Sequence, residues 1–400
     1  MRQPDLASPR FKANPYPFYA HLRDEAPVYR ATLPGKKPAW LITRYDDVLA
    51  VLKDDRFAKD PLHAQTAEQR RKAPWVPGVL KPLARNMLDL DDPDHARLRA
   101  LVHKAFTPRR VEQLRERIQT LCDELLQAAA AKGQSDLVAD FALPVPLTVI
   151  SELLGIPLQD RQRFHRWTKR VVAVSSWRDL LLALPGLWRF TRYVRVLIAQ
   201  RRDAPQDDVI TALVQAEAEG DRLSEDELLA MVTILIIAGH ETTVNLIGNG
   251  TLALLQHPEQ LGLLRENPAL IKPAVEELLR FASPVQMATE RYAREDVTIG
   301  GTMISRGELV LAALGAANRD ERQFPTPDVL DITREPNRHL AFGQGAHFCV
   351  GAPLARLEGA IAFETLLRRS PGLRLAEPLA ALRWRRGVFL LGLERLPVTL

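Results

Sequence analysis

The chain has 400 residues, of which 46% are hydrophobic and 26% are charged, and this composition excludes wholesale disorder. Its two cysteines, Cys122 and Cys349, exclude a disulfide framework and favour a reducing compartment. The net charge of +5 comes from arginine, with 43 Arg against 11 Lys, and leaves an acidic partner, nucleic acid or an anionic cofactor open.

The N-terminal sequence contains prolines and charges and lacks the apolar core of a signal peptide. The longest apolar run, Leu228–Gly239, is shorter than the ~20 residues that a membrane span needs. We therefore expect a soluble, cytoplasmic protein without a membrane anchor.

Local signals near the N-terminus predict a small mixed region. A short helix is expected over 14–26, and the runs 28–33 and 38–44 predict two strands that turn at Pro34-Gly35. A further helix is expected over 45–53. Residues 58–93 hold five prolines from Pro61 to Pro93 and are expected to be irregular.

From Asp94 onward, apolar residues recur mostly at helical spacing. The longest helix is expected over 224–256, because Ser224 and Glu227 form a capping box and Pro258 ends it. Gly300-Gly301 predicts a hairpin within the strand-rich interval 286–314. Other helices are expected over 94–106, 108–132, 145–154, twice within 160–203 with a break near Pro185, and over 273–281 and 352–369. The fold class is therefore mainly α with a small β portion, in one large domain of residues 1–400.

Cys349 lies between glycines, just before the last predicted helix. Gly345 and Gly351 allow positive φ and a close approach of the backbone to a flat object, and the helix N-terminus favours a thiolate. Such a thiolate attacks carbon or binds metal, whereas a lone cysteine is also common as a buried structural residue. A zinc site of His339, His347 and Cys349 is less favoured, because the paired-ligand spacing is missing.

Three further groups of polar residues stand out. Glu241 and Thr242 place an acid beside an alcohol in an apolar helix, which indicates either a solvated opening or a structural kink. Glu277 and Arg280, at i and i+3, form a pair that taken alone is typical of a helix surface. The basic residues His95 and Arg99 share a helix face, and Arg291 and His347 lie on later segments.

Together these motifs resemble the cytochrome P-450 family. The segment Phe342-x-x-Gly345-x-x-x-Cys349-x-Gly351 is similar to its haem-binding signature, and the other motifs follow in the family's order and spacing. The resemblance extends from Asn14 to Val398. It implies the cytochrome P-450 fold, with haem b between the long central helix and the helix after the cysteine.

The resemblance also implies roles for single residues. Cys349 would be the axial ligand of the iron, Glu241 and Thr242 would deliver protons to bound dioxygen, and Ala238 would leave room for oxygen and substrate. Phe342 would shield the sulfur, beside Gly345 and Gly351. The haem propionates would bind His95, Arg99, Arg291 and His347; Glu277, Arg280 and Arg334 would be structural, with Arg338 competing for the third place.

The implied activity is insertion of one oxygen atom from dioxygen into a lipophilic small molecule, by hydroxylation or epoxidation. Electrons would come from ferredoxin and ferredoxin reductase. Two alternatives stay open, a peroxide-driven peroxygenase and a non-catalytic haem-binding sensor. Nucleic-acid binding is disfavoured because the arginines are spread out. By family position the substrate pocket would include Ile234, Ile237, Val285, Gln286, Val388 and Phe389, together with the loop Trp75–Leu88 and the segment 165–195.

Overall fold

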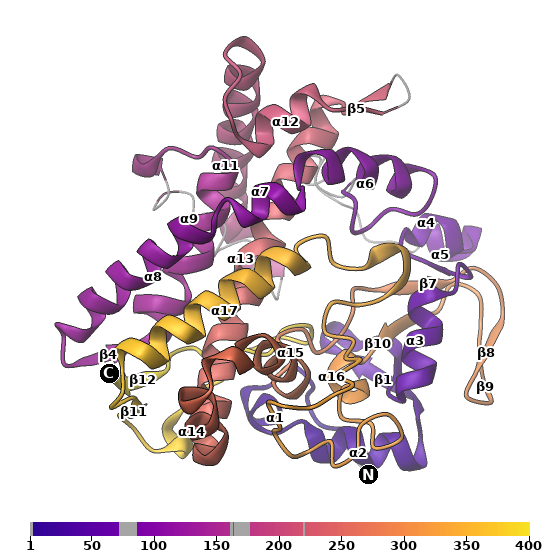
Figure 1. Ribbon diagram of the computed structural model, residues 1–400. Coiled ribbons are helices and arrows are strands. Elements are labelled where there is room, and N and C mark those ends of the chain that lie inside the picture. The colour runs from indigo at the N-terminus through magenta and orange to yellow at the C-terminus, as the bar shows by residue number, and fades with distance from the viewer. Residues whose placement is uncertain (1–2, 72–85, 161–162, 164–176, 219–220) are drawn as a thin grey trace. The chain divides into compact units, whose positions relative to one another are not determined.

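The computed structural model describes residues 3–71, 86–160, 163, 177–218 and 221–400. The chain forms two compact units (Figure 1). The first contains Met1–Ala73, Arg115–Val145 and Thr242–Leu400, and the second contains Pro74–Leu114 and Pro146–Glu241. A mainly α chain with a small β portion is thus confirmed. The expectation of one domain over residues 1–400 stays a prediction.

A five-stranded sheet forms part of the first unit, in the order β1-β2-β10-β7-β3. The expected hairpin is present, since β1 (Val28–Leu33) pairs antiparallel with β2 (Lys37–Ile42) through a turn in which Gly35 has a φ of 77°. The second expected hairpin joins β8 and β9 at Gly300-Gly301. The remaining bounds are β10 Leu309–Ala312, β7 Arg291–Ala293, β3 Phe57–Ala58, β8 Val297–Ile299 and β9 Thr302–Ile304.

Short helices bury their apolar side chains against this sheet. Leu41 of β2 and Leu311 of β10 are fully buried, in one core cluster with Phe11 and Tyr19 from the N-terminal helices. Val48 and Val51 belong to a second cluster. The helices of this part are α1 (Pro9–Ala13), α2 (Tyr16–Glu25), α3 (Tyr45–Lys53), α4 (Pro61–Ala64), α5 (Ala67–Arg71) and α16 (Leu314–Ala317).

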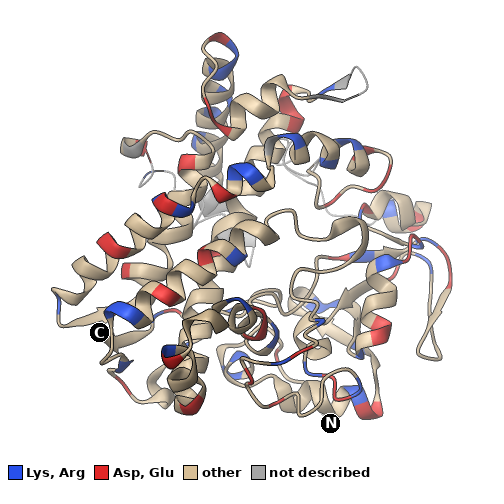
Figure 2. Ribbon diagram, viewed as in Figure 1, with Lys and Arg blue, Asp and Glu red and all other residues tan. Residues whose placement is uncertain are grey.

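The rest of the first unit is built around α17 (Ala352–Arg369), which packs against α8 (Arg115–Ala130) and α15 (Ile271–Phe281) (Figure 1). Ion pairs join α8 to α17, since Asp123 accepts from Arg368 at 3.2 Å and from Arg369 at 3.0 Å. Charged residues of both signs occur along these helices (Figure 2). Other elements here are β4 Gln134–Asp136, η4 Val138–Ala142, α14 Pro258–Glu266, β11 Arg374–Leu375 and β12 Pro397–Thr399.

The second unit is helical. Its α11 (Trp177–Asp203) packs against α12 (Val209–Gln215), and the buried Arg201 pairs with the buried Asp208 at the N-cap of α12. The other elements are α6 Asp94–Ala105, α7 Pro108–Glu112, α9 Pro144–Leu153, β5 Glu217–Ala218 and β6 Asp221–Arg222. The first two residues of α9 belong to the first unit.

The long helix α13 (Glu225–Gln256) begins in the second unit and ends in the first. The expected capping box is present, because Ser224 accepts from the Glu227 amide at 3.3 Å and Glu227 accepts from the Ser224 amide at 2.8 Å. Among the described residues, α13 alone is long and apolar enough to cross a membrane, but 72% of its most apolar window is buried. That burial is typical of a core helix.

Three expectations about helices were wrong. The helix expected over 108–132 is divided into α7 and α8, because the Leu114 amide turns back to the Val111 carbonyl at 3.1 Å. The helix α11 continues through Pro185, although proline lacks one backbone donor. The interval expected to be irregular contains α4 and α5.

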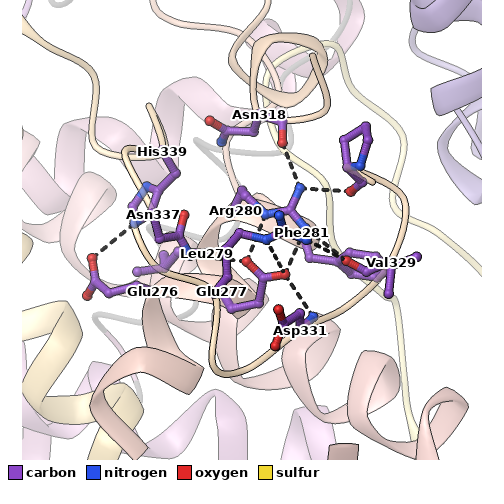
Figure 3. A network of polar contacts seen from close by, with 12 residues as sticks. Glu276, Glu277, Leu279, Arg280, Phe281, Asn318, Val329, Asp331, Asn337 and His339 are labelled. Atoms are coloured by element: carbon purple, nitrogen blue, oxygen red, sulfur yellow. Dashed lines mark hydrogen bonds and ion pairs between the residues drawn. The ribbon is translucent and has the colours of Figure 1, made fainter. Parts of the chain in front are cut away.

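A buried ion pair in α15 holds the segment that leads to the cysteine (Figure 3). Arg280 donates to both carboxylate oxygens of Glu277, at 2.7 and 2.8 Å, and both side chains are fully buried. The other Arg280 donors reach the carbonyls of Asn318 at 2.9 Å, Pro327 at 2.8 Å and Val329 at 3.2 Å. The guanidinium therefore holds the backbone at these three carbonyl groups.

Glu277 accepts the remaining hydrogen bonds of this network. It accepts from the Asp331 amide at 3.0 Å, the Asn337 side chain at 3.0 Å and Arg334 at 3.3 Å. Arg334 thus occupies the third place, while Arg338 is exposed and contributes its carbonyl to the Tyr45 hydroxyl at 2.7 Å. The carboxylate and the guanidinium are both fully hydrogen-bonded, which makes their burial tolerable.

We predict that Arg280→Met lowers the free energy of unfolding by about 3–5 kcal/mol, because Glu277 is left as a buried charge without its principal partner. Denaturant unfolding of the haem-loaded protein measures this loss. Arg338→Met removes an exposed charge from the same connected segment and should change stability by less than about 0.5 kcal/mol. Equal effects of the two substitutions would contradict the role given to the pair.

A second buried acid lies where α17 meets α13 and α8. Glu358 is 1% exposed and accepts a hydrogen bond from the Thr243 hydroxyl. Burial raises the pKa of Glu358 to about 8, although the Thr243 hydrogen bond opposes this shift. Burial, and then the charge of Glu358, raise the pKa of the Cys122 thiol to about 12. At neutral pH both groups are therefore mainly uncharged.

Glu358 should make stability depend on pH. Its carboxyl titrates near 4.5 when unfolded and near 8 when folded, so the folded state binds the extra proton between these values. The free energy of unfolding then falls as pH rises through this window, by up to ~1.4 kcal/mol per pH unit. Glu358→Gln should abolish this decline in denaturant unfolding curves. The exposed Glu364→Gln on the same helix should retain it, and a decline that persists in Glu358→Gln would refute the assignment.

Candidate active site

The loop that carries Cys349 is shaped by glycines. Gly343 and Gly345 have φ values of 68° and 75°, and a Cβ on Gly345 would lie 2.7 Å from the Leu52 carbonyl oxygen. The Cys349 amide donates to the Phe342 carbonyl at 2.9 Å, and α17 begins three residues later with Gly351 as its N-cap. The thiol is exposed. It is therefore presented at the N-terminal end of an 18-residue helix, where negative charge is favoured.

The Phe342 ring beside the cysteine is covered by a cation. The Arg356 guanidinium lies 4.5 Å from the ring centroid, and it donates to Glu276 at 2.7 and 2.8 Å. His339 approaches the same carboxylate at 3.0 Å. Burial opposes ionisation of Glu276, but these hydrogen bonds lower its pKa to about 2. The position of the Phe342 ring is thus fixed by a permanent ion pair.

One face of α13 is partly exposed. Between Leu228 and Leu254 every residue is buried except five, and these recur at helical spacing. They are small or apolar apart from one hydroxyl, and comprise the four predicted site residues Ile234, Ile237, Ala238 and Thr242 together with Gly239. A buried helix with one partly exposed apolar stripe of this kind can line one side of a site for a bound molecule.

Glu241 adjoins this stripe. Its side chain is about one-tenth exposed, and Oε1 lies 3.8 Å from Nε2 of the fully buried His240. The other ring nitrogen of His240 is 2.7 Å from the Ile236 carbonyl, which orients the ring. Glu241 is therefore a nearly buried carboxylate next to an imidazole, and it directly precedes the partly exposed residue Thr242.

The four predicted propionate ligands are distributed over the two units. In the second unit, the buried His95 has Nδ1 3.1 Å from Asp92 and shares a face of α6 with the half-exposed Arg99. In the first unit, Arg291 is 4% exposed on β7, and His347 is half-exposed in the turn before Cys349. Each unit therefore supplies one histidine and one arginine.

The predicted substrate residues behave differently from one another. Val285, Val388 and Phe389 are half-buried and pack on the core clusters. Gln286 differs from the expectation, because its side chain is fully buried and donates to the Ser283 carbonyl at 2.9 Å, while its amide binds the Phe389 carbonyl at 2.8 Å. Residues 75–85 of the loop Trp75–Leu88 and residues 165–176 of the segment 165–195 lie outside the described residues.

Several residues that shape the site escaped the sequence analysis. Glu276 holds Arg356 over Phe342, Asn337 binds Glu277, and Glu358 lies beside Thr243. Glu276 directly precedes Glu277, and two adjacent acids on a helix are indistinguishable in sequence from a solvated surface. Only the arginines and histidine that approach them from distant segments reveal their roles.

Haem requires a soft axial ligand, space beside it and cations for two propionates. Cys349 is exposed, and a Cβ on Gly351 would lie 3.8 Å from its sulfur, at ordinary van der Waals distance. The partly exposed residues of α13 and the four basic residues His95, Arg99, Arg291 and His347 are of the types that the other requirements call for. Across the described residues, no group of three His, Cys, Asp or Glu side chains could hold a metal ion, so a zinc site gains no support.

Comparison with known proteins gives one consistent answer. Residues 6–370 match the family model for cytochrome P450. The chain is 47% identical to the polyketide biosynthesis cytochrome P450 PksS of Bacillus subtilis, over 98% of this chain and 96% of that protein. It is 46% identical to the vitamin D(3) 25-hydroxylase of Pseudonocardia autotrophica, over 100% of this chain and 96% of that protein.

Solved structures agree with this result. The structure of PksS superposes with a TM-score of 0.93 at 45% identity, covering 100% of both chains. The myxobacterial cytochrome P450 CYP267B1 in complex with myristic acid has a TM-score of 0.93 at 44% identity, covering 99% of both chains. The expected fold, the haem b cofactor and the monooxygenase class are confirmed, and the chain belongs to the cytochrome P450 family.

Proposed function

We propose that the Cys349 thiolate would hold the iron of haem b in this monooxygenase. The observation that carries this proposal is the exposed thiol in a glycine turn at the start of α17. When bound, haem supplies the oxygen activation and the oxidising power. The protein's own part is to hold the sulfur as a thiolate, to exclude water and to place protons and substrate.

Proton supply is the role that we assign to Glu241 and Thr242. Thr242 lies on the partly exposed stripe of α13, while Glu241 is nearly buried beside His240. A hydroxyl can donate and accept at once, so Thr242 can pass on a proton that the carboxyl of Glu241 replenishes. An intact acid and alcohol favour dioxygen over peroxide as the oxidant.

The bases His95, Arg99, Arg291 and His347 are proposed to hold the two propionates. Arginine binds carboxylates in a bidentate manner, and hydrogen bonds to ionised groups are the stronger ones. Asp92 fixes the His95 ring by its contact at 3.1 Å, so the opposite ring nitrogen keeps a defined direction.

The substrate is proposed to be a lipophilic small molecule. The partly exposed stripe of α13 is formed by Ile234, Ile237 and small residues, and Val285, Val388 and Phe389 supply further apolar surface. The relatives named above include a hydroxylase of vitamin D(3) and a protein bound to myristic acid. Vitamin D(3) and myristic acid are both lipophilic.

Electrons are proposed to come from ferredoxin and ferredoxin reductase, with the enzyme in the cytoplasm. Lys104 and Arg109 are exposed and suit an acidic donor. Arg356 is already paired with Glu276 and stacked on Phe342, so its contribution to docking would be smaller.

We predict that Cys349→Ala abolishes the red-shifted Soret band of the reduced carbon-monoxide complex, because the other cysteine of the sequence, Cys122, is buried. Difference spectra of the purified protein provide the test. Cys122→Ala, which removes the buried thiol, should leave the band unchanged. A thiolate-type spectrum in Cys349→Ala would rule out the proposed ligand.

We further predict that Thr242→Ala reduces product formed per electron pair about tenfold, the effect of losing one hydrogen bond of ~1.4 kcal/mol. Oxygen consumption should continue, with hydrogen peroxide as the main product. Simultaneous assays of oxygen, peroxide and product reveal this uncoupling. Thr242→Ser retains the hydroxyl and should stay coupled, whereas unchanged coupling in Thr242→Ala would remove Thr242 from the proton path.

A further inference from the structure

Lys12 is a buried cation that the proposed mechanism does not use. It lies in α1 and is 1% exposed, and its ammonium donates to the Val388 carbonyl at 3.0 Å. None of the ion pairs found between described residues includes Lys12. Burial accordingly lowers the pKa of Lys12 to about 8. Keeping this side chain charged at neutral pH therefore costs folding free energy that a buried methionine would not cost.

The partner of Lys12 is a turn that carries two proposed substrate contacts. The Phe389 carbonyl accepts from the amides of Gln286 at 2.8 Å and Met287 at 3.3 Å. The Leu391 amide donates to the Pro284 carbonyl at 2.8 Å. Backbone hydrogen bonds thus fix the turn from Phe389 onward. The preceding carbonyl, that of Val388, is held by Lys12.

The N-terminal segment approaches the same turn at two further points. The Gly387 amide donates to the Ala7 carbonyl at 3.0 Å, and Arg386 pairs with Asp5 at 2.8 Å on the surface. Val388 and Phe389 also pack on the core cluster that contains Phe11. Of these contacts only the one from Lys12 is both charged and buried, so solvent screens it least.

We propose that Lys12 is a positioning residue, which fixes the backbone at Val388 and thereby the substrate-facing placement of Val388 and Phe389. The inference rests on the proposed function, in which these two side chains line the substrate pocket. A charged donor holds a carbonyl more strongly than a neutral one. The arrangement is a trade of stability for function, which is common at binding sites.

The central experiment compares Lys12→Met with Arg10→Met in the haem-loaded protein. Methionine has nearly the length of lysine but no donor, and Arg10 is an exposed residue of the same helix. Two azoles are titrated by the Soret shift: clotrimazole, whose aryl groups fill a substrate pocket, and imidazole, which is too small to reach its walls. This readout needs neither turnover nor an electron donor.

For Lys12→Met we expect clotrimazole affinity to fall about tenfold, the effect of a lost charged hydrogen bond of ~1.5 kcal/mol. Imidazole affinity should stay within about twofold, and the melting temperature should be unchanged or higher. The amides of Gln286 and Leu391 should exchange hydrogen faster. Arg10→Met should show none of these effects, and Lys12→Arg, which restores a cationic donor, should recover clotrimazole affinity in part.

Two outcomes would overturn the proposal. A lower melting temperature with equal losses for both azoles would mean that Lys12 is only structural. Unchanged clotrimazole binding in Lys12→Met would remove its positioning role. Phe389→Ala then separates the two hypotheses: if it weakens clotrimazole, the proposed pocket stands and only the Lys12 inference fails. If it has no effect either, the assignment of this turn to the pocket fails.

Discussion

The buried pair of Glu277 and Arg280 is the interaction on which the geometry of the first unit depends most. Two charges without solvent are unfavourable unless every donor and acceptor is used. The network meets this condition by recruiting backbone at Asn318, Val329 and Asp331, which lie far from α15 in sequence. The need to satisfy the charges thus dictates the course of the chain that leads to the cysteine loop. An apolar pair would fill the same volume, but it would place no constraint on those carbonyls.

The long helix α13 illustrates a different constraint. Its centre is buried on all sides but one, and the partly exposed residues are small or apolar, with one hydroxyl. A partly exposed apolar stripe on a core helix is unfavourable in water unless a ligand covers it. The residues opposite the stripe, such as His240 and Thr243, make polar contacts within the protein instead. One helix thereby separates a ligand-facing side from a side that is fixed by the core.

Local signals explain why much of this was predictable from sequence. A capping box at Ser224, a Gly-Gly hairpin and a proline after a helix act through neighbouring residues, so the long helix and the hairpin lie where they were expected. The burial of Gln286 was not foreseen, because its neighbours in sequence do not reveal that Ser283 and the Phe389 segment enclose it. Glu358 was missed for the same reason, since its meaning depends on Thr243 and on Cys122 from two other helices. Contacts between residues that are distant in sequence cannot be predicted from the spacing of apolar residues.

Lys12 and Glu358 extend this reasoning to energetics. Both are single ionisable groups buried with one hydrogen-bond partner from another element, and burial shifts the pKa of each toward about 8 from opposite sides. A core built only for stability would replace them by methionine or glutamine. Lys12 contacts Val388, which we assign to the substrate pocket. Glu358 contacts Thr243, which directly follows the proposed proton donor Thr242. Both buried groups therefore contact residues at or next to the proposed site, where they can fix backbone and side-chain positions.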